Sequence, residues 1–159
     1  MRNVLAVALA ILLAPAAHPQ ESGCTLLNTL VAGAVTGFPE QRGDAWDNGW
    51  FDSNLYMTGA DDCSIKVGDY NLFYCVWGFN SLTDANSLAG ALADTAKHCL
   101  SGWTAQDTAG RKSSNNLTIT KGLTLSGVGV HAGVQVLVFA ESFQNSKESQ
   151  VTIEVRRSV

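Results

Sequence analysis

The chain has 159 residues, of which 46% are apolar and 15% are charged, and it contains three prolines. This composition is typical of a globular protein with enough apolar material for a core, and it argues against intrinsic disorder. The formal net charge is −4 at pH 7, which argues against a surface that follows the phosphates of nucleic acid. We therefore expect no nucleic-acid partner and, at this length, a single folded domain.

Residues 1–19 have the pattern of a secretory signal peptide. A cationic start at Arg2 is followed by an apolar run from Val4 to Leu13 and then by small residues. A membrane-spanning helix needs about 20 apolar residues, roughly twice the length of this run. The sequence predicts a signal peptide over 1–19, one domain over 20–159, no transmembrane segment, and export to the periplasm or the outside of the cell.

The first predicted helix spans Cys24–Val35, where apolar residues recur at the spacing of one helical face. Gly37 and Pro39 are expected to end it. Residues 38–62 hold many aspartates and aromatic residues, and we expect mostly loop there, with a strand near 50–58.

Two runs rich in aromatic and β-branched residues, 63–67 and 70–77, flank Gly68 and predict a β-hairpin. If the turn is centred near Asp69, period-2 alternation places Cys63 and Cys75 on the same face of the sheet. That face is also the more apolar one, so we expect it to be buried.

A second helix is predicted to begin at Ser81 or Thr83 and to end at Gly102, with a narrow stripe of mostly small side chains. The stripe consists of Ala85, Leu88, Ala89, Leu92, Ala96 and Cys99. Residues 104–116 are polar and are expected to form an exposed connection. Strand-like runs follow at 117–125, 134–139 and 151–155, with a turn at 144–148.

This order of elements predicts an α+β fold rather than alternating βαβ units. We expect an antiparallel sheet with two helices packed on one face, in the order α-β-β-β-α-β-β-β, held by two disulfides. The sequence contains no evident internal repeat.

Four cysteines in an exported domain predict two disulfides. The strand after Cys75 advances ~17 Å and the following helix returns ~24 Å, so Cys99 is expected to end near Cys75. We therefore predict Cys75 with Cys99 and Cys24 with Cys63. The alternative bridge, Cys63 with Cys75 across the hairpin, stays open.

The sequence permits two other fates for these cysteines. Ser22-Gly23-Cys24 could end a lipoprotein cleavage site with an acylated Cys24, although Glu21 stands where an aliphatic residue is expected. A structural zinc site is disfavoured because no two cysteines have the short C-x-x-C spacing. We expect no metal and no cofactor.

Residues 40–69 hold seven acidic side chains against Arg42 and Lys66, and they also contain several aromatic residues. An acidic, aromatic surface suits the binding of another protein, and a basic protein would fit best. The predicted binding residues are Trp46, Asp47, Trp50, Phe51 and Asp52.

No catalytic signature was found, and no G-x-S-x-G motif occurs, so we predict no catalytic residues and expect a protein that is not an enzyme. His98 at the end of a helix and His131 in a turn have structural explanations. The function expected from the sequence is an exported, disulfide-stabilised binding module with a protein-interaction, inhibitor or immunity-like role.

Two alternatives remain from the sequence. The first is a small secreted hydrolase of sugar or cell-wall polymers that uses two aspartates ~5–10 Å apart. Its candidates are Asp44, Asp47, Asp52, Asp61 and Asp62. The second is an envelope scaffold or assembly subunit, which predicts a sheet edge open to another chain.

Overall fold

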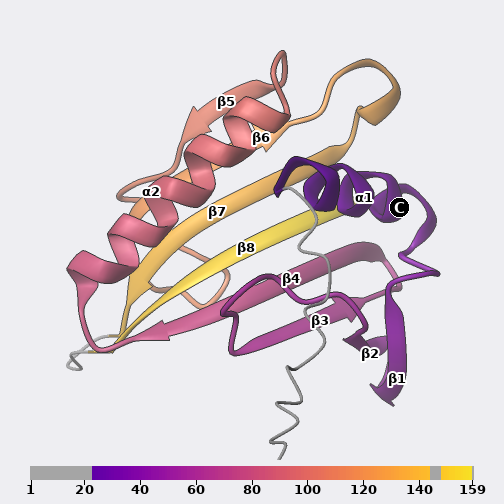
Figure 1. Cartoon of the computed structure of the whole chain (residues 1–159), viewed down its shortest axis with the longest axis horizontal. Helices are drawn as coiled ribbons and strands as arrows, with labels where there is room; N and C mark the ends of the chain where they lie inside the picture. Colours follow the sequence, from indigo (N-terminus) through magenta and orange to yellow (C-terminus); the bar gives the residue numbers. More distant parts are fainter. Residues whose placement is uncertain (1–22, 144–147, 159) are drawn as a thin grey trace, which may run out of the picture.

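The computed structural model describes residues 23–143 and 148–158. Within them the chain forms two α-helices, a 3-10 turn and a sheet of eight strands, all antiparallel (Figure 1). The elements are α1 (Gly23–Thr36), β1 (Arg42–Asp47), β2 (Trp50–Ser53), β3 (Asp62–Lys66), β4 (Tyr70–Phe79), α2 (Leu82–Cys99), β5 (Thr104–Asp107), β6 (Ile119–Ser126), η1 (Gly129–His131), β7 (Val134–Ser142) and β8 (Ser149–Ser158).

The predicted α+β fold, its antiparallel sheet and its order of helix, strands, helix, strands are confirmed. Each group of strands contains one more member than the predicted order. The additional strands arise in 38–62 and 104–116, for which the sequence predicts mostly loop and an exposed connection. In β1 the register shifts twice, and in β5 every residue is exposed, so neither strand has the clean alternation that sequence patterns detect.

The sheet order is β1-β2-β3-β4-β8-β7-β6-β5, which repeats one arrangement twice. Each half consists of one helix followed by four strands, and exchanging the two halves gives the same order read from the other end of the sheet. The halves meet where β4 pairs with β8 over ten residues, from Tyr70 opposite Ser158 to Phe79 opposite Ser149. This repeat is not visible in the sequence, because the buried positions of the two halves carry different residues.

Local signals account for the helix ends. Gly37 adopts a φ of +79° after α1, and the Phe38 N–H donates to the Gly33 carbonyl at 2.8 Å, which satisfies the end of the helix. At the start of α2, the Ser81 hydroxyl accepts the Asp84 N–H at 3.3 Å, as its sequence predicted.

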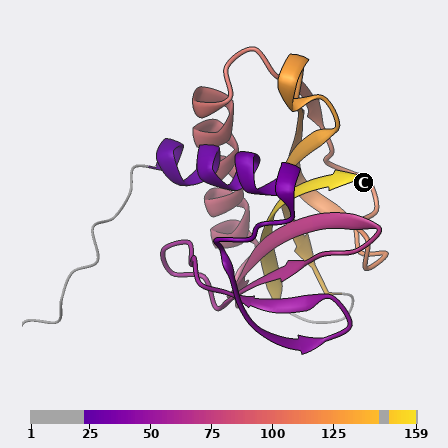
Figure 2. The same ribbon diagram turned by 90° about the vertical axis from the view of Figure 1, so that its right-hand side faces the viewer.

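Both helices lie on the same side of the sheet in Figure 2, and their buried residues belong to one apolar core with the strands. The small residues of α2 let it approach the sheet closely, since Ala85, Ala89, Ala93 and Ala96 are all buried. We call the opposite side of the sheet the open face; neither helix of residues 23–143 and 148–158 covers it.

The predicted disulfide pairing is wrong. The structure joins Cys24 to Cys99 and Cys63 to Cys75, the second being the bridge that the sequence left open. Cys63 and Cys75 are direct partners across β3 and β4, with Cα atoms 4.1 Å apart.

The error came from the path of α2. The prediction assumed that this helix returns over β4, whereas it packs mainly against β7, β6 and β8. Its last residue, Cys99, therefore meets the start of α1 at Cys24, with a Cα separation of 5.0 Å. The sulfur of Cys24, considered above for acylation, is bonded to Cys99.

Two predictions concern residues outside the described ones. The signal peptide over 1–19 lies before residue 23, and most of the turn predicted at 144–148 falls within residues 144–147. The hairpin around Gly68 and Asp69 is confirmed, since β3 and β4 flank it and Cys63 and Cys75 share the buried face.

Candidate functional site

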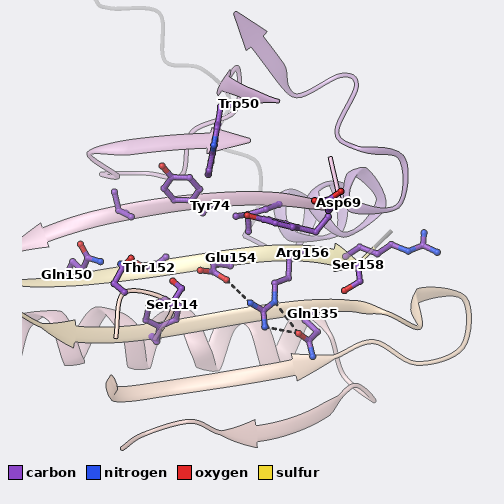
Figure 3. Close-up of a pocket in the computed structure, with 16 residues that line it drawn as sticks. Trp50, Asp69, Tyr74, Ser114, Gln135, Gln150, Thr152, Glu154, Arg156 and Ser158 are labelled. Carbon is purple, nitrogen blue, oxygen red and sulfur yellow. Dashed lines mark hydrogen bonds and ion pairs between the residues drawn. The ribbon is translucent and has the colours of Figure 1, made fainter. Parts of the chain in front are cut away.

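The open face of the sheet carries a cavity of about 650 Å³, which we call the open-face groove (Figure 3). Its floor is β8, where apolar side chains that face the core alternate with polar ones that face the groove. The floor residues are Gln150, Thr152, Glu154, Arg156 and Ser158. From Gln150 to Ser158 the strand advances by eight residues, which at ~3.3 Å per residue makes the floor ~26 Å long.

Two different walls border this floor. On one side lie alternate residues of β4 and the indole of β2, namely Tyr70, Leu72, Tyr74, Val76 and Trp50. On the other side lie residues of β7 and of the loop before β6, namely Gln135, Phe139, Ser114 and Asn115. In Figure 3, Trp50 and Tyr74 are seen on one side of β8, and Ser114 and Gln135 are seen on the other.

A charged pair occupies the floor. Arg156 Nη1 lies 3.4 Å from Glu154 Oε2, and Arg156 also donates from Nε and Nη2 to Gln135 Oε1, at 3.2 and 3.0 Å. Gln135 and Arg156 are direct partners across β7 and β8, which brings these groups together. The guanidinium is therefore held in one orientation by groups on two strands.

Glu154 has the more protected side chain of the pair, 13% exposed against 44% for Arg156. Burial raises the pKa of Glu154 above its ordinary value of 4.5; Arg156 opposes this effect, and Glu141 adds to it. The floor thus contains a carboxyl group that is harder to ionise than an exposed glutamate.

Trp50 forms the outer part of the β4 wall and is fixed by aromatic and cationic neighbours. Its ring stacks on Trp46 with centroids 5.7 Å apart and meets Tyr74 edge to face at 5.8 Å. The Lys66 ammonium lies 5.2 Å from the centre of the Trp50 ring, a cation–π contact.

The turn before Trp50 depends on a glycine. Gly49 has a φ of +74°, and its carbonyl accepts the Val67 N–H at 2.8 Å. This bond ties the β1–β2 turn to the hairpin after β3, so the position of Trp50 follows from two turns that are close in space.

The opposite wall is anchored by a buried carboxylate. Glu141 is fully buried, and its Oε1 accepts Asn115 Nδ2 at 3.4 Å and Gln150 Nε2 at 2.5 Å. These bonds connect the loop that carries Ser114 and Asn115 to β7 and to the floor. The second oxygen, Oε2, is buried without a partner.

The five binding residues predicted from the sequence separate in the structure. Trp46 and Trp50 stack together, and Asp52 lies on the same face of β2 as Trp50 because the two are two residues apart. Phe51 lies on the other face against the core. Asp47 accepts the Asn48 N–H at 2.7 Å, a local turn contact.

The aspartates considered for hydrolysis accept hydrogen bonds from the chain or are exposed. Asp61 Oδ2 accepts the Gly78 N–H at 2.6 Å, and Asp62 Oδ2 accepts the Ser64 hydroxyl at 3.2 Å. Asp44 and Asp52 are exposed. None of the five lines the open-face groove.

Sequence reasoning missed the residues of the floor. The alternation of Gln150, Thr152, Glu154 and Arg156 with valine and isoleucine was a readable sign of a strand with one polar face. It could not indicate a groove, because the walls come from β2 and β4, far earlier in the chain, and from β7 and the loop before β6.

The two histidines considered in the sequence lie outside the open-face groove. His131 ends η1 and lies 5.9 Å from the Trp103 ring, and His98 lies exposed in the last turn of α2. Across residues 23–143 and 148–158, no group of three or more histidine, cysteine or acidic residues is placed to hold a metal ion. Neither helix of this part of the chain has the length and apolar character of a membrane span.

Comparison of the chain with known protein families, curated proteins and solved structures found no match to any of them. Function must therefore be inferred from the fold and from the geometry of the groove.

Proposed function

We propose that this protein is an exported, disulfide-stabilised binding module that takes its ligand in the open-face groove and catalyses no reaction. The observation that carries the proposal is the groove itself, which combines a polar floor, an aromatic wall and a wall of amide and hydroxyl side chains. Such a concave site with a few fixed polar groups is the usual form of a binding site.

Export is supported by the cysteines. All four are in disulfides, and such bridges persist mainly in the periplasm and outside the cell. This agrees with the signal peptide expected over 1–19, and the proposed location remains periplasmic or extracellular.

The groove, rather than the acidic segment, is the better candidate surface. The acidic residues of 40–69 are spread along β1, β2 and both ends of β3 and do not form one patch. The two cations among them contact aromatic rings: the Arg42 guanidinium lies 5.0 Å from the centre of the Phe51 ring, and the Lys66 ammonium lies 5.2 Å from the centre of the Trp50 ring. A basic protein partner, expected from the sequence, is therefore kept as one outcome of the test.

Affinity capture tests the proposal. The full chain, expressed for export and carrying a purification tag, is incubated with cell-envelope extract beside a Trp50→Ala/Tyr74→Ala variant and a Tyr56→Ala control. Tyr56 is 55% exposed and does not line the groove. We expect the groove variant to lose the retained ligand and the control to keep it; equal retention by all three would contradict the proposal.

A hydrolase of sugar polymers is the second candidate, because of Glu154. A carboxyl group with a raised pKa in a groove suits a general acid. Release of sugar from wall material distinguishes the two functions: a hydrolase would release sugar and lose this activity in Glu154→Gln, whereas a binding module would release none.

An assembly subunit is supported less well. The sheet has edges at β1 and β5, but these strands have only six and four residues, and β1 is interrupted by register shifts. Short and irregular edges resist the addition of another strand.

A further inference from the structure

We infer that the ligand of the open-face groove is a neutral, unbranched oligosaccharide chain bound along β8. This inference rests on the proposed binding function and names the chemistry of its ligand. Four properties of the groove support it: its shape, the pairing of β8, its charge balance and its hydrogen-bonding groups.

The shape fits an elongated ligand. The floor runs from Gln150 to Ser158, ~26 Å. Side chains of β4 border it from Ser158 to Thr152, and side chains of β7 border it from Arg156 to Thr152. A small compact molecule would contact only part of such a trough, whereas a chain of linked rings would contact all of it.

The pairing of β8 disfavours a peptide bound as an added strand. β8 is hydrogen-bonded to β4 on one side and to β7 on the other over nearly its whole length. Strand addition needs a free sheet edge, because the added backbone is held by main-chain bonds. A ligand on this face must be held by side chains instead.

The charges of the residues that line the groove balance, and the neighbouring acidic group Glu141 is buried and hydrogen-bonded to Asn115 and Gln150. Asp69 and Glu154 contribute two negative charges, and Arg156 and Arg157 contribute two positive ones. The central charges are already paired with each other, so an incoming charged group would displace an existing partner or be desolvated without one. A neutral ligand avoids both costs.

The remaining groups match hydroxyls. The amides of Asn115, Gln135 and Gln150 can both donate and accept hydrogen bonds, as the hydroxyls of a sugar do. Each of these amides uses one end on Glu141 or Arg156, which fixes its orientation. The rings of Tyr70 and Tyr74 line the groove and offer apolar surface to the C–H faces of sugar rings. The Trp50 ring, already in contact with Trp46 and Lys66, borders the groove mainly by its edge.

Calorimetric titration with defined oligosaccharides tests the inference. The probes are neutral cello-, xylo- and chito-oligosaccharides from the disaccharide to the octasaccharide, with oligogalacturonate as an anionic probe and oligolysine as a cationic peptide. We expect at least one neutral series to bind, with an affinity that rises with chain length and levels off once the chain exceeds the groove.

Variants locate the binding. Tyr74→Ala is expected to weaken binding by about tenfold or more, and Tyr56→Ala is expected to leave it unchanged. Gln135→Ala, which keeps β4 intact, provides a second groove variant if Tyr74→Ala unfolds. It should also weaken binding, because Arg156 loses the acceptor that orients it.

Two results would overturn the inference: no neutral series binds at millimolar concentration, or a charged probe binds more tightly than every neutral one. If the envelope ligand captured above still depends on Trp50 and Tyr74, only the oligosaccharide assignment fails. If that capture is also independent of these residues, the groove is not the binding site and both proposals fail.

Discussion

The bridge between the two helices is expected to contribute more to stability than the bridge within the sheet. Cys24 and Cys99 are 75 residues apart in the sequence, and Cys63 and Cys75 are 12 apart. Since the loss of unfolded-state entropy grows with the logarithm of loop length, these separations correspond to about 4.5 and about 2.8 kcal/mol at 25 °C.

Two double variants separate these contributions. Cys24→Ser/Cys99→Ser removes the long bridge at partly exposed positions, where serine loses little packing. Cys63→Val/Cys75→Val removes the short bridge and keeps apolar volume at two fully buried positions. We expect urea unfolding to give the larger loss of free energy for the first variant, by roughly 1–2 kcal/mol.

Peptide mapping checks the pairing directly, because trypsin places each cysteine in a different peptide. Under non-reducing conditions, peptide 43–66 should be found joined to 67–97, and 98–111 joined to the peptide that ends at Arg42. Peptide 67–97 joined to 98–111, or a smaller loss of stability for Cys24→Ser/Cys99→Ser, would refute the reasoning.

Three other predictions follow from the core, the turns and the groove. Burial raises the pKa of Glu154, so between pH 4.5 and this raised value the folded chain keeps a proton that the unfolded chain has released. The free energy of unfolding should therefore fall as the pH rises through this interval. Urea unfolding at a series of pH values should show this fall for the wild type and not for Glu154→Gln. Gly49→Ala should destabilise the chain by about 1–3 kcal/mol more than Gly110→Ala. Both glycines have positive φ, but only at Gly49 would an added Cβ collide with the Val67 carbonyl. Equal shifts of the thermal unfolding midpoint for the two variants would contradict this. Ala89→Leu should cost about 1–3 kcal/mol by overpacking the contact between α2 and the sheet, and the exposed Ala91→Leu should change stability by less than about 0.5 kcal/mol; similar denaturation midpoints for the two variants would argue against close packing of α2.

Elements defined by local rules were predictable from the sequence. The helices follow from 3.6-residue spacing and from Ser81 and Gly37 at their ends, and the hairpin follows from Gly68 and Asp69 between two apolar runs. To predict that Cys63 and Cys75 share a face, it was enough to know that side chains alternate along a strand and where the turn between the two strands is centred. Each of these inferences uses only residues of the same helix or strand, or of two elements that are adjacent in the sequence.

The prediction of the candidate site was partial for the same reason. Trp50 was identified, because an indole among aspartates is visible in a short window of sequence. Its separation from Phe51 depends on which face of β2 meets the core. Glu154 and Arg156 were not identified as site residues, since nothing near them in the sequence distinguishes their face of β8 from any other polar strand face.

The sequence by itself determined the strand and helix character of most of the chain, its two-disulfide capacity and its expected export. Tertiary structure alone decided the cysteine partners and the groove. The path of α2 over β6, β7 and β8 carries Cys99 away from Cys75 and toward Cys24. The meeting of β4 with β8 brings Tyr74 opposite Glu154, 80 residues later in the chain, because sheet pairing joins segments whose separation no local pattern records.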